Sequence, residues 1–402
     1  MSHDHGDMCW RTAAIETVQQ VRAAVLSETE TEAVGLDDVS GRVLAESITA
    51  SRTLPEYDRA TMDGYAFDAT DEYPLTVVEG EVYPEDDPPS IDEGEAVEIA
   101  TGASLPPEAN AVLKREESTV DGDQLTGTTL EVGTYTYERG SNVERGEVLF
   151  ERGERLSPKD AVFLGDLGYD SVDVRARLSV GVLATGTEIH EGRQSDLDSN
   201  MLVGLVRSWG HEATYEGTVP DEYDRVREAI ADLETEYDVL LTTGGTSVGH
   251  KDHVVRALSE LGEVRFHRVR VRPGKPLALA ELPEAVAFAV PGKPLGAHTI
   301  ATLVVRPFFT GESTLPSLEA TCARDVELGP EGFEYAVPVT LDDGEALPLG
   351  HADSALRVYD ETFDPSVLSS STRATRADGF VLTRSALDGG EAVDVVPYPV
   401  VE

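Results

Sequence analysis

The chain has 402 residues, of which 40% are hydrophobic, and its 32 Lys and Arg stand against 76 Asp and Glu, a formal net charge of -44. This length allows roughly two to four domains with proper cores, and recurrent segments with apolar periodicity exclude a disordered chain. The anionic field disfavours nucleic acids and anionic membrane surfaces as partners.

The acidic residues are spread along the whole chain, which indicates a halophilic surface adapted to high salt. Screening there suppresses self-repulsion, because the Debye length falls to about 3 Å at 1 M salt. Only Cys9 and Cys322 are present, which excludes a disulfide framework and a cysteine-based metal site. The sequence has neither a secretion signal nor an apolar run of membrane-spanning length, so we expect a cytoplasmic protein.

The first part of the chain predicts a helical domain that is interrupted by a β domain. Helical periodicity covers residues 12–25 and 36–48, and Ser157-Pro158 is a typical start for a further helix over 161–167. Residues 68–150 are rich in Pro, Gly, Val and Thr and contain short alternating runs, which predict strands. We therefore expect a helical domain over 1–48 plus 152–176 and an inserted β domain over 49–151.

From Leu178 onward, strand and helix patterns alternate. This alternation predicts a doubly wound α/β domain over 177–311, with a parallel sheet covered by helices on both faces. The expected strands are 178–184, 213–218, 239–242, 264–271 and 286–290. The expected helices are 201–209, 223–233, 252–261 and 295–305. Residues 312–402 return to short strands with Gly, Pro and Asp turns, which predict a C-terminal β-barrel, so the fold class is α/β multidomain.

The loops that leave the expected strands carry carboxylates, hydroxyls, glycines and lysines. In open parallel sheets ligands bind outside the carboxyl ends of the strands, so we expect these loops to form one polar crevice. The five loops are 185–188, 219–221, 243–247, 272–276 and 291–294.

The stretch 238–252 reads as a short buried strand, a glycine-rich loop and the start of a helix. This order directs backbone N–H groups at an oxyanion, and the helix N-terminus adds partial positive charge. An ordinary glycine-rich turn is the alternative for an isolated motif. The convergence of the other loops favours the binding interpretation.

The chain contains only five lysines, and three of them, Lys251, Lys275 and Lys293, lie in glycine- or proline-rich loops that follow apolar runs. Two of these loops have the sequence Pro-Gly-Lys-Pro, which is also a good turn sequence. The repetition of the tetrapeptide, with Arg272 just before the first copy, favours oxyanion binding.

Three carboxylates follow expected strands and could hold Mg²⁺, which prefers few carboxylates together with substrate phosphate oxygens. These are Glu188, Asp221 and Asp252, and the alternative for each is a helix N-cap or a solvated turn. No Ser/His/Asp or Cys/His arrangement is evident. The residues therefore favour an electrostatic mechanism that positions a phosphorylated ligand, neutralises it and brings a second oxyanion beside it.

These motifs together resemble the molybdopterin molybdenumtransferase family, the MoeA and gephyrin E-domain group. The matching segments occur in family order at 60–66, 101–102, 139–143, 185–189, 198–200, 219–221, 243–249, 272–276 and 291–294. The resemblance implies an elongated homodimer of four-domain subunits with sites formed between subunits. It also implies that adenylylated molybdopterin and molybdate react, with Mg²⁺, to give molybdenum cofactor and AMP, and that other molybdenum-cofactor enzymes are candidate partners.

The resemblance also implies roles for individual residues. The implied catalytic residues are Asp63, Glu188, Asp221, Asp252 and Lys275, of which Glu188, Asp221 and Asp252 are the implied metal ligands. The implied contacts to the pterin, phosphate and molybdate are Thr101, Thr185, Gly186, Gly244, Gly245, Thr246, Ser247, Arg272, Pro276, Pro291, Lys293 and Pro294.

The chain departs from the family pattern at three places. Lys293 stands where the family usually has asparagine, Asn142 where some members have aspartate, and segment 332–337 lacks an arginine often found near that point. Lys293 is a candidate replacement for the missing cation, and a preference for tungstate is an alternative explanation. Two rival functions are a non-catalytic paralogue that binds or delivers molybdopterin, and the molybdopterin adenylylating enzyme, which the additional domains disfavour.

Overall fold

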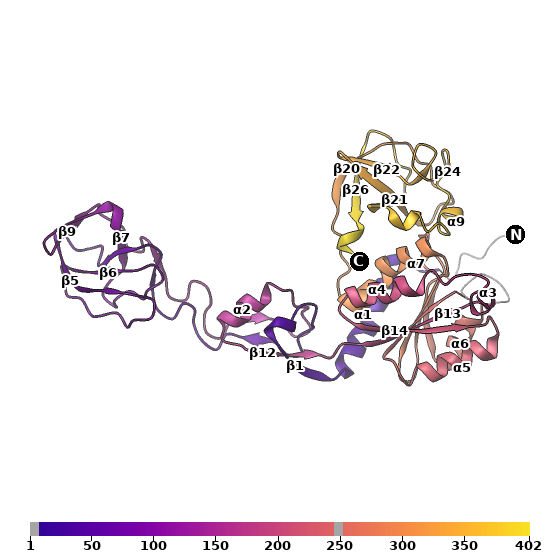
Figure 1. Ribbon diagram of the computed structural model, residues 1–402, viewed down its shortest axis with the longest axis horizontal. Coiled ribbons are helices and arrows are strands. Elements are labelled where there is room, and N and C mark those ends of the chain that lie inside the picture. The colour runs from indigo at the N-terminus through magenta and orange to yellow at the C-terminus, as the bar shows by residue number, and fades with distance from the viewer. Residues whose placement is uncertain (1–7, 245–251) are drawn as a thin grey trace. The chain divides into compact units, whose positions relative to one another are not determined.

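The computed structural model describes residues 8–244 and 252–402, which fold as two compact units (Figure 1). The first unit comprises the chain up to Glu32, Ser40–Arg42 and Arg175–Glu402. The second comprises Ala33–Val39 and Val43–Val174. No helix in the described part of the chain is both long and apolar enough to cross a bilayer.

A six-stranded mixed sheet forms the centre of the first unit. In spatial order its strands are β14 (Glu212–Val219), β13 (Ser179–Thr185), β15 (Val239–Thr243), β19 (Val286–Val290), β18 (Ala278–Glu281) and β16 (Glu263–His267). The first four are parallel, and β18 is antiparallel to both of its neighbours. Consequently β16 runs in the same direction as the parallel strands, and its carboxyl end lies at the same edge of the sheet as theirs.

Helices cover both faces of this sheet, as the apolar strand sequences predict. Figure 1 shows α1, α4 and α7 over one face and α5 and α6 over the other. Val180 and Val182 of β13 pack with the first group, whereas the intervening Leu183 packs with the second, because successive strand side chains point to opposite faces. The bounds are α1 Arg11–Glu28, α3 Thr187–His190, α4 Ser199–Ser208, α5 Tyr223–Leu233, α6 His253–Leu261, α7 Pro294–Ile300, the π-helical segment η3 Ala301–Val305 and α8 Arg306–Thr310.

Residues after 317 form a closed five-stranded barrel, because β21 and β25, the first and last of its five strands in spatial order, also pair with each other. Its strands are β21 (Glu334–Asp342), β22 (Glu345–Pro348), β20 (Leu318–Cys322), β26 (Ala392–Pro397) and β25 (Gly379–Thr383), with β23 (Gly350–His351), β24 (Arg357–Tyr359) and α9 (Pro365–Leu368) in its connections.

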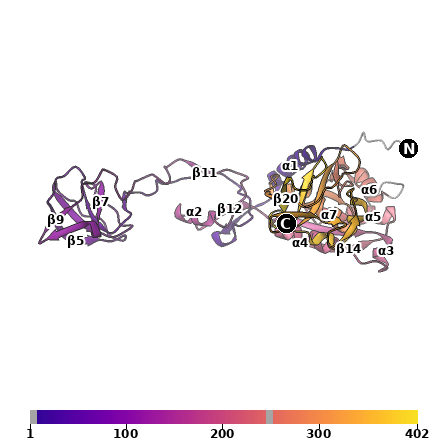
Figure 2. The ribbon, with the colours of Figure 1, turned by 90° about the horizontal axis from the view of Figure 1, so that it is seen from above.

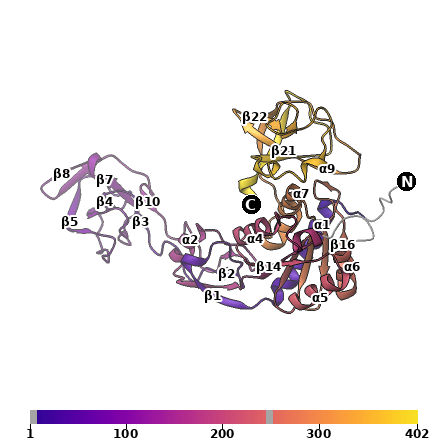
Figure 3. The ribbon, with the colours of Figure 1, turned by 45° about the vertical axis from the view of Figure 1, so that its right-hand side comes forward.

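The barrel and the α/β sheet share one hydrophobic core, which contains Val304 and Phe308 as well as Tyr335 and Val337. Two backbone connections fix the barrel beside the carboxyl edge of the sheet. The short strand β17 (Val271–Arg272) pairs in parallel with β21 of the barrel. Beside it, α9 lies next to α7 (Figure 3), where the N–H of Leu295 donates to the carbonyl of Ser369 at 3.1 Å.

The second unit contains a six-stranded β sheet and a smaller region with its own core. The sheet is seen from above in Figure 2, and its strands are β4 (Gly64–Phe67), β5 (Leu75–Val82), β6 (Glu95–Ile99), β7 (Ala111–Lys114), β8 (Ser118–Asp121) and β9 (Gln124–Gly127). The smaller region packs Leu44, Leu164 and Val174 together. The remaining elements are β1 (Thr31–Gly35), β2 (Ile48–Thr49), β3 (Arg59–Ala60), β10 (Thr136–Tyr137), β11 (Val148–Phe150), α2 (Asp160–Asp166) and β12 (Ser171–Arg175).

The structure corrects three expectations about the elements. The prediction of a helix over 36–48 is wrong, because only Leu36–Asp38 forms a 3₁₀ turn. Val43 and Leu44 are buried, and their backbones form isolated β bridges. The helix α1 forms as expected, but it packs in the first unit, against α8 and η3, and not in a separate helical domain. The sheet is mixed and not wholly parallel, because the unexpected strand β18 runs antiparallel.

Candidate functional site

Five loops meet at the carboxyl edge of the sheet and enclose a cavity of about 440 Å³, the sheet-edge cavity. The convergence of these loops, predicted from the strand ends, is confirmed. Predicted site residues that line the cavity are Thr185, Gly186, Glu188, Asp221, Gly244, Pro276, Pro291, Lys293 and Pro294. Residues 245–251, and with them the predictions for Gly245, Thr246, Ser247 and Lys251, lie outside the described residues.

Two glycines allow the loops to approach one another. Gly244 has φ +88°, and a Cβ atom there would lie 2.4 Å from the carbonyl oxygen of Thr185. A Cβ atom on Gly292 would lie 2.8 Å from the Cα atom of Gly244. Both distances are shorter than any real Cβ contact, so the cavity wall depends on glycine at both positions.

The sheet-edge cavity is lined by more carboxylates than the sequence predicted. Besides Glu188 and Asp221, the loop before α4 contributes Asp196 and Asp198. One carboxylate oxygen of Asp221 is buried and has no hydrogen-bond partner, while the backbone N–H of Asp221 donates to the hydroxyl oxygen of Thr187 at 3.0 Å. The side chain of Asp221 therefore does not cap the following helix α5, which was the alternative role that the sequence left open.

Asp198 is the most buried of these carboxylates, with 6% of its surface exposed. Its Oδ2 accepts a hydrogen bond from the Thr243 hydroxyl at 3.2 Å, whereas its Oδ1 is buried and has no partner. Burial raises the pKa of Asp198 to about 6, the Thr243 hydrogen bond opposes that rise, and the nearby Asp196 charge adds to it. At neutral pH the cavity thus holds a carboxylate whose charge is poorly solvated.

Replacing Asp198 by asparagine is expected to stabilise the protein in a pH-dependent way. The folded-state pKa lies above its usual value of 3.8, so the charged form is disfavoured in the fold and wild-type stability falls as pH rises through about 6. One pKa unit corresponds to about 1.4 kcal/mol, so Asp198→Asn should gain up to about 3 kcal/mol at pH 7.5 and almost nothing near pH 4. Denaturant unfolding of both proteins across this range measures the difference, and a gain that does not depend on pH would contradict it.

A second, smaller cavity of about 230 Å³, the lysine cavity, adjoins the first. It lies between the first Pro-Gly-Lys-Pro loop and the barrel segment 365–369, and its polar lining residues are Arg272, Lys275, Lys293, Ser366 and Ser369. The two cavities share Pro276, Pro291 and Lys293 as a common wall. Lys293 therefore lies in the same cavity as Gly244, as the sequence predicted, and Lys275 lies in the adjoining cavity.

Two of the three cations of the lysine cavity, Arg272 and Lys293, are held in place by neighbouring groups. The guanidinium of Arg272 lies over the ring of Phe333, 4.2 Å from its centroid. The Nζ of Lys293 donates to the carbonyl of Ser366 at 3.1 Å. Burial lowers the pKa of Lys275, and the positive charges of Arg272 and Arg268 lower it further. An anion that enters this cavity would meet two cations, Arg272 and Lys275, that are partly buried and have already lost part of their hydration.

The first Pro-Gly-Lys-Pro loop can pack this tightly only because of its glycine. Gly274 has φ +112°, and a Cβ atom there would lie 2.9 Å from Cβ of Ile300 and 3.2 Å from the carbonyl oxygen of Gly296. The loop therefore lies directly on α7, and this contact directs Lys275 into the lysine cavity.

Asp252 does not line either cavity among the residues that the structure describes. It caps α6 by accepting a hydrogen bond from the N–H of Val255 at 3.4 Å, and its other oxygen lies 3.7 Å from Nε2 of His267. Burial raises its pKa, and the Val255 N–H opposes this rise. In residues 8–244 and 252–402 no three His, Cys, Asp or Glu side chains are close enough to form a metal site by themselves.

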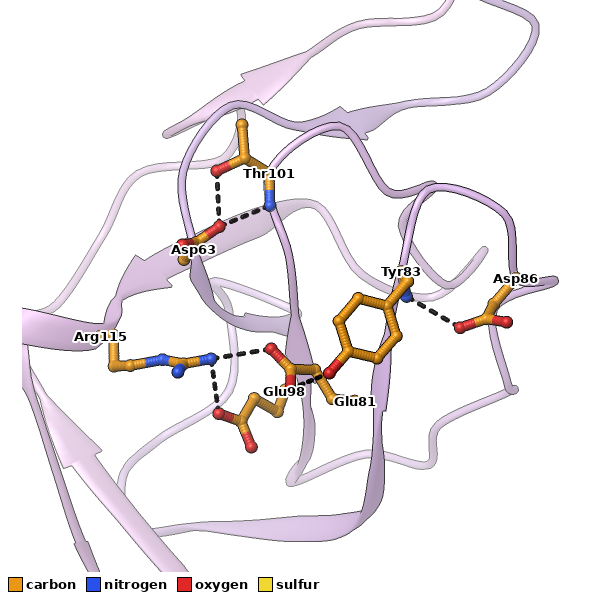
Figure 4. Close-up of polar contacts among 7 residues, drawn as sticks. All are labelled: Asp63, Glu81, Tyr83, Asp86, Glu98, Thr101 and Arg115. Carbon is orange, nitrogen blue, oxygen red and sulfur yellow. Dashed lines mark hydrogen bonds and ion pairs between the residues drawn. The ribbon is translucent and has the colours of Figure 1, made fainter.

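Asp63 and Thr101 belong to the second unit and contact each other (Figure 4). One carboxylate oxygen of Asp63 accepts from both the hydroxyl and the N–H of Thr101, each at 2.7 Å. Both hydrogen bonds lower the pKa of Asp63, and the bond from the hydroxyl has the larger effect. The pair presents a fixed, charged carboxylate at the surface of its own unit.

A second polar group lies near this pair. The guanidinium of Arg115 bridges Glu81 at 2.9 Å and Glu98 at 2.7 Å, and Glu81 also accepts from the hydroxyl of Tyr83 at 2.7 Å (Figure 4). The backbone N–H of Arg115 donates to the carbonyl of Asp63 at 3.1 Å. Arg115 thus links the turn that carries Asp63 to strands β5 and β6.

Asp196, Asp198, Ser366 and Ser369 were not predicted as site residues, although Asp198 belongs to the segment 198–200 that resembles the family. Asp198 lies one residue before an apolar helix, where aspartate is typical of an N-cap. Residues 369–372 are all serine or threonine, but nothing in the sequence places this segment against the lysine loops. The pairing of β17 with the barrel provides that placement.

Two protein-family models match successive parts of the chain. Residues 12–168 match the MoeA N-terminal region (domain I and II), and residues 181–311 match a probable molybdopterin binding domain. A molybdopterin molybdenumtransferase of Haemophilus influenzae is 30% identical over 72% of this chain and 76% of its own length. One from Bacillus subtilis is 31% identical over 74% of each chain.

A solved structure supports the same relationship along the whole chain. The molybdopterin biosynthesis MoeA protein from Pyrococcus horikoshii is similar with a TM-score of 0.70 and 28% sequence identity, over 97% of this chain and 99% of its own. The sequence matches, the shared fold and the loops gathered at the sheet edge agree with one another. The chain belongs to the MoeA-type molybdopterin molybdenumtransferase family.

Proposed function

We propose that this protein inserts molybdate into adenylylated molybdopterin in a Mg²⁺-dependent reaction that releases AMP and molybdenum cofactor. One observation carries the proposal: two adjoining cavities of opposite charge share a wall formed by Pro276, Pro291 and Lys293. The carboxylate-lined cavity suits the phosphorylated pterin with its metal ion, and the cation-lined cavity suits the tetrahedral oxyanion.

In the lysine cavity, Arg272, Lys275 and Lys293 neutralise the incoming molybdate. Contacts with Phe333 and Ser366 hold Arg272 and Lys293 before the anion arrives, so these two cations need little reorganisation during the reaction. Ser366 and Ser369 line the same cavity, and their hydroxyl groups donate to the Asp364 carboxylate and to the carbonyl of Ser366. The shared wall keeps the oxyanion close to the pterin ligand, which lowers the entropic cost of bringing the two together.

The residues of the sheet-edge cavity fit a magnesium ion that also takes oxygens from its substrate. Mg²⁺ is usually held by one or two carboxylates together with phosphate oxygens and waters. Asp221, with its buried unpartnered oxygen, and Glu188 would hold the ion. The ion would neutralise phosphate charge in this anionic cavity. Asp252, the third predicted ligand, would act by fixing the start of α6.

Incubation of the purified protein with adenylylated molybdopterin, Mg²⁺ and molybdate tests the proposal through the appearance of AMP. Molybdate-dependent AMP release is the expected result. Binding of the pterin without AMP release would instead indicate the delivery paralogue. In a parallel incubation with molybdopterin and ATP, consumption of ATP would indicate the adenylylating enzyme. AMP release with tungstate alone would indicate the tungstate-specific form.

The proposal includes a homodimer in which each site takes residues from both subunits, and Asp63 with Thr101 would be the contribution of the second unit. Asp63→Asn and Lys275→Ala should each be inactive. When the two variants are dissociated, mixed in equal amounts and reassociated, half of the dimers are mixed and each has one intact site, so about a quarter of wild-type AMP release should return. Mixing Lys275→Ala with Arg272→Ala is the matched control and should recover nothing, since both residues belong to one cavity. No recovery in the first mixture would contradict sites formed between subunits.

A further inference from the structure

Asp198 has no structural task that accounts for its burial. It precedes α4, yet its side chain makes no cap hydrogen bond there. The capping is done by Asp196, whose Oδ1 accepts from the N–H groups of Asp198 and Ser199 at 3.2 and 3.1 Å. The only hydrogen bond to the Asp198 carboxylate in the described part of the chain comes from Thr243. Its second oxygen is left without a partner.

A buried acceptor without a partner is costly, since it has lost its water and gained nothing in return. Asp198 lines the sheet-edge cavity, so a ligand there can supply the missing donor. No cation of the described chain makes an ion pair with Asp198, and Lys293 of the same cavity donates to the carbonyl of Ser366. The carboxylate is therefore suited to an N–H donor, and unsuited to the phosphate end of a ligand.

The proposed substrate has one part that matches this requirement. The amino-pyrimidinone edge of a pterin carries two adjacent donors, the ring N3–H and the 2-amino group, and no acceptor between them. The corresponding edge of adenine places a ring nitrogen acceptor beside its single amino group, which would face the carboxylate unfavourably. Of the two ring systems in adenylylated molybdopterin, only the pterin has a double-donor edge.

We propose that Asp198 recognises the 2-amino-pyrimidinone edge of the pterin through its unpartnered Oδ1. This inference rests on the proposed function and adds to it, because it assigns the pterin end of the substrate to the floor of the sheet-edge cavity beside Thr243. The phosphates then extend toward Glu188 and Asp221. Asp198 is thereby a specificity-determining residue, a role that the sequence did not predict.

Two fluorescent probes that differ at one position test the assignment. In 6-hydroxymethyllumazine a carbonyl replaces the 2-amino group of 6-hydroxymethylpterin, so an acceptor faces the carboxylate. A hydrogen bond to a charged group contributes about 1.5–3 kcal/mol, so wild type should bind the pterin about 10- to 100-fold more tightly than the lumazine. Asp198→Asn, whose amide can serve the carbonyl, should reduce this preference to less than about 3-fold.

Glu191→Gln is the matched control, since it neutralises an exposed carboxylate of the same loop region that pairs with Arg193, and it should keep the wild-type preference. Equal binding of both probes by wild type, or an unchanged preference in Asp198→Asn, would overturn the assignment. The wild-type comparison decides the matter even if the variant fails to fold. AMP release separates the two proposals: release without probe preference refutes only the role of Asp198, whereas preference without release refutes only the transferase reaction.

Discussion

Lys275→Ala should lower molybdate-dependent AMP release about 100-fold or more, the loss typical when one preorganised electrostatic group is removed from a site. Lys275 is partly buried beside Arg272, and burial lowers its pKa, so the cavity loses a cation that water screens poorly. Binding of the adenylylated pterin in the adjoining cavity should change by only a few fold. Steady-state AMP release and pterin binding by fluorescence measure the two effects separately.

Lys159→Ala is the control for this variant, because Lys159 is exposed, precedes α2 in the second unit and lines neither cavity. It should release AMP at the wild-type rate. The lowered pKa of Lys275 provides a second check. As the pH rises, the ammonium loses its proton and wild-type activity should fall. This fall should occur at a lower pH than the pKa of an ordinary lysine would predict. Normal AMP release by Lys275→Ala would remove this lysine from the mechanism.

Gly244→Ala should abolish pterin binding and destabilise the first unit. Alanine at φ +88° costs roughly 1–2 kcal/mol by itself. The added Cβ would also lie 2.4 Å from a backbone carbonyl that cannot move without displacing β13, so the Thr185 and Gly244 loops must separate. Because both loops line the sheet-edge cavity, its shape is lost together with stability.

Gly204→Ala provides the matched control within the same domain. Gly204 is exposed in α4, and a Cβ there would meet nothing within 4 Å. Alanine in a helix interior is better than glycine by roughly 0.5–1 kcal/mol, so this variant should be more stable than wild type and fully active. Chemical denaturation and pterin binding compare the two variants, and a Gly244→Ala protein that binds pterin normally would show that the close approach is not required.

The sequence predicted the α/β core well because its evidence is local. β13, β15 and β19 are short apolar runs buried on both faces, and α5 repeats its buried Val226 and Ile230 at helical spacing. The loops between them follow from the strand order, so their meeting at one edge could be predicted. That prediction holds although β18 is antiparallel to its neighbours, because β16 still ends at the same edge of the sheet.

The errors arise where burial depends on distant partners. Leu36, Val39 and Val43 have helical spacing, yet Gly41 adopts φ +78° within that segment, and Val43 pairs with Arg155 far along the chain. The helix α1 has a clear apolar face, but periodicity does not say which domain covers that face. Only the folded structure assigns it to the first unit.

The site was predicted in the same uneven way. The composition of the loops was enough to predict that Lys275, Lys293 and Gly244 line the cavities. It was not enough to predict the different roles of three aspartates. Asp252 caps a helix, and Asp221 has a carboxylate oxygen without a hydrogen-bond partner. Asp198 occupies the N-cap position of α4, but its side chain makes no capping hydrogen bond. These differences depend on which donors lie within reach, and that is a property of the folded loops.

Anomalous scattering from molybdenum in crystals grown with molybdate and a pterin ligand tests most directly whether the two cavities divide the two substrates. We predict a molybdenum peak in the lysine cavity, in contact with Lys275 and Arg272, and pterin density on the other side of the wall formed by Pro276, Pro291 and Lys293. A molybdenum peak among the carboxylates of the sheet-edge cavity, or one that leaves the lysine cavity empty, would contradict the proposed function.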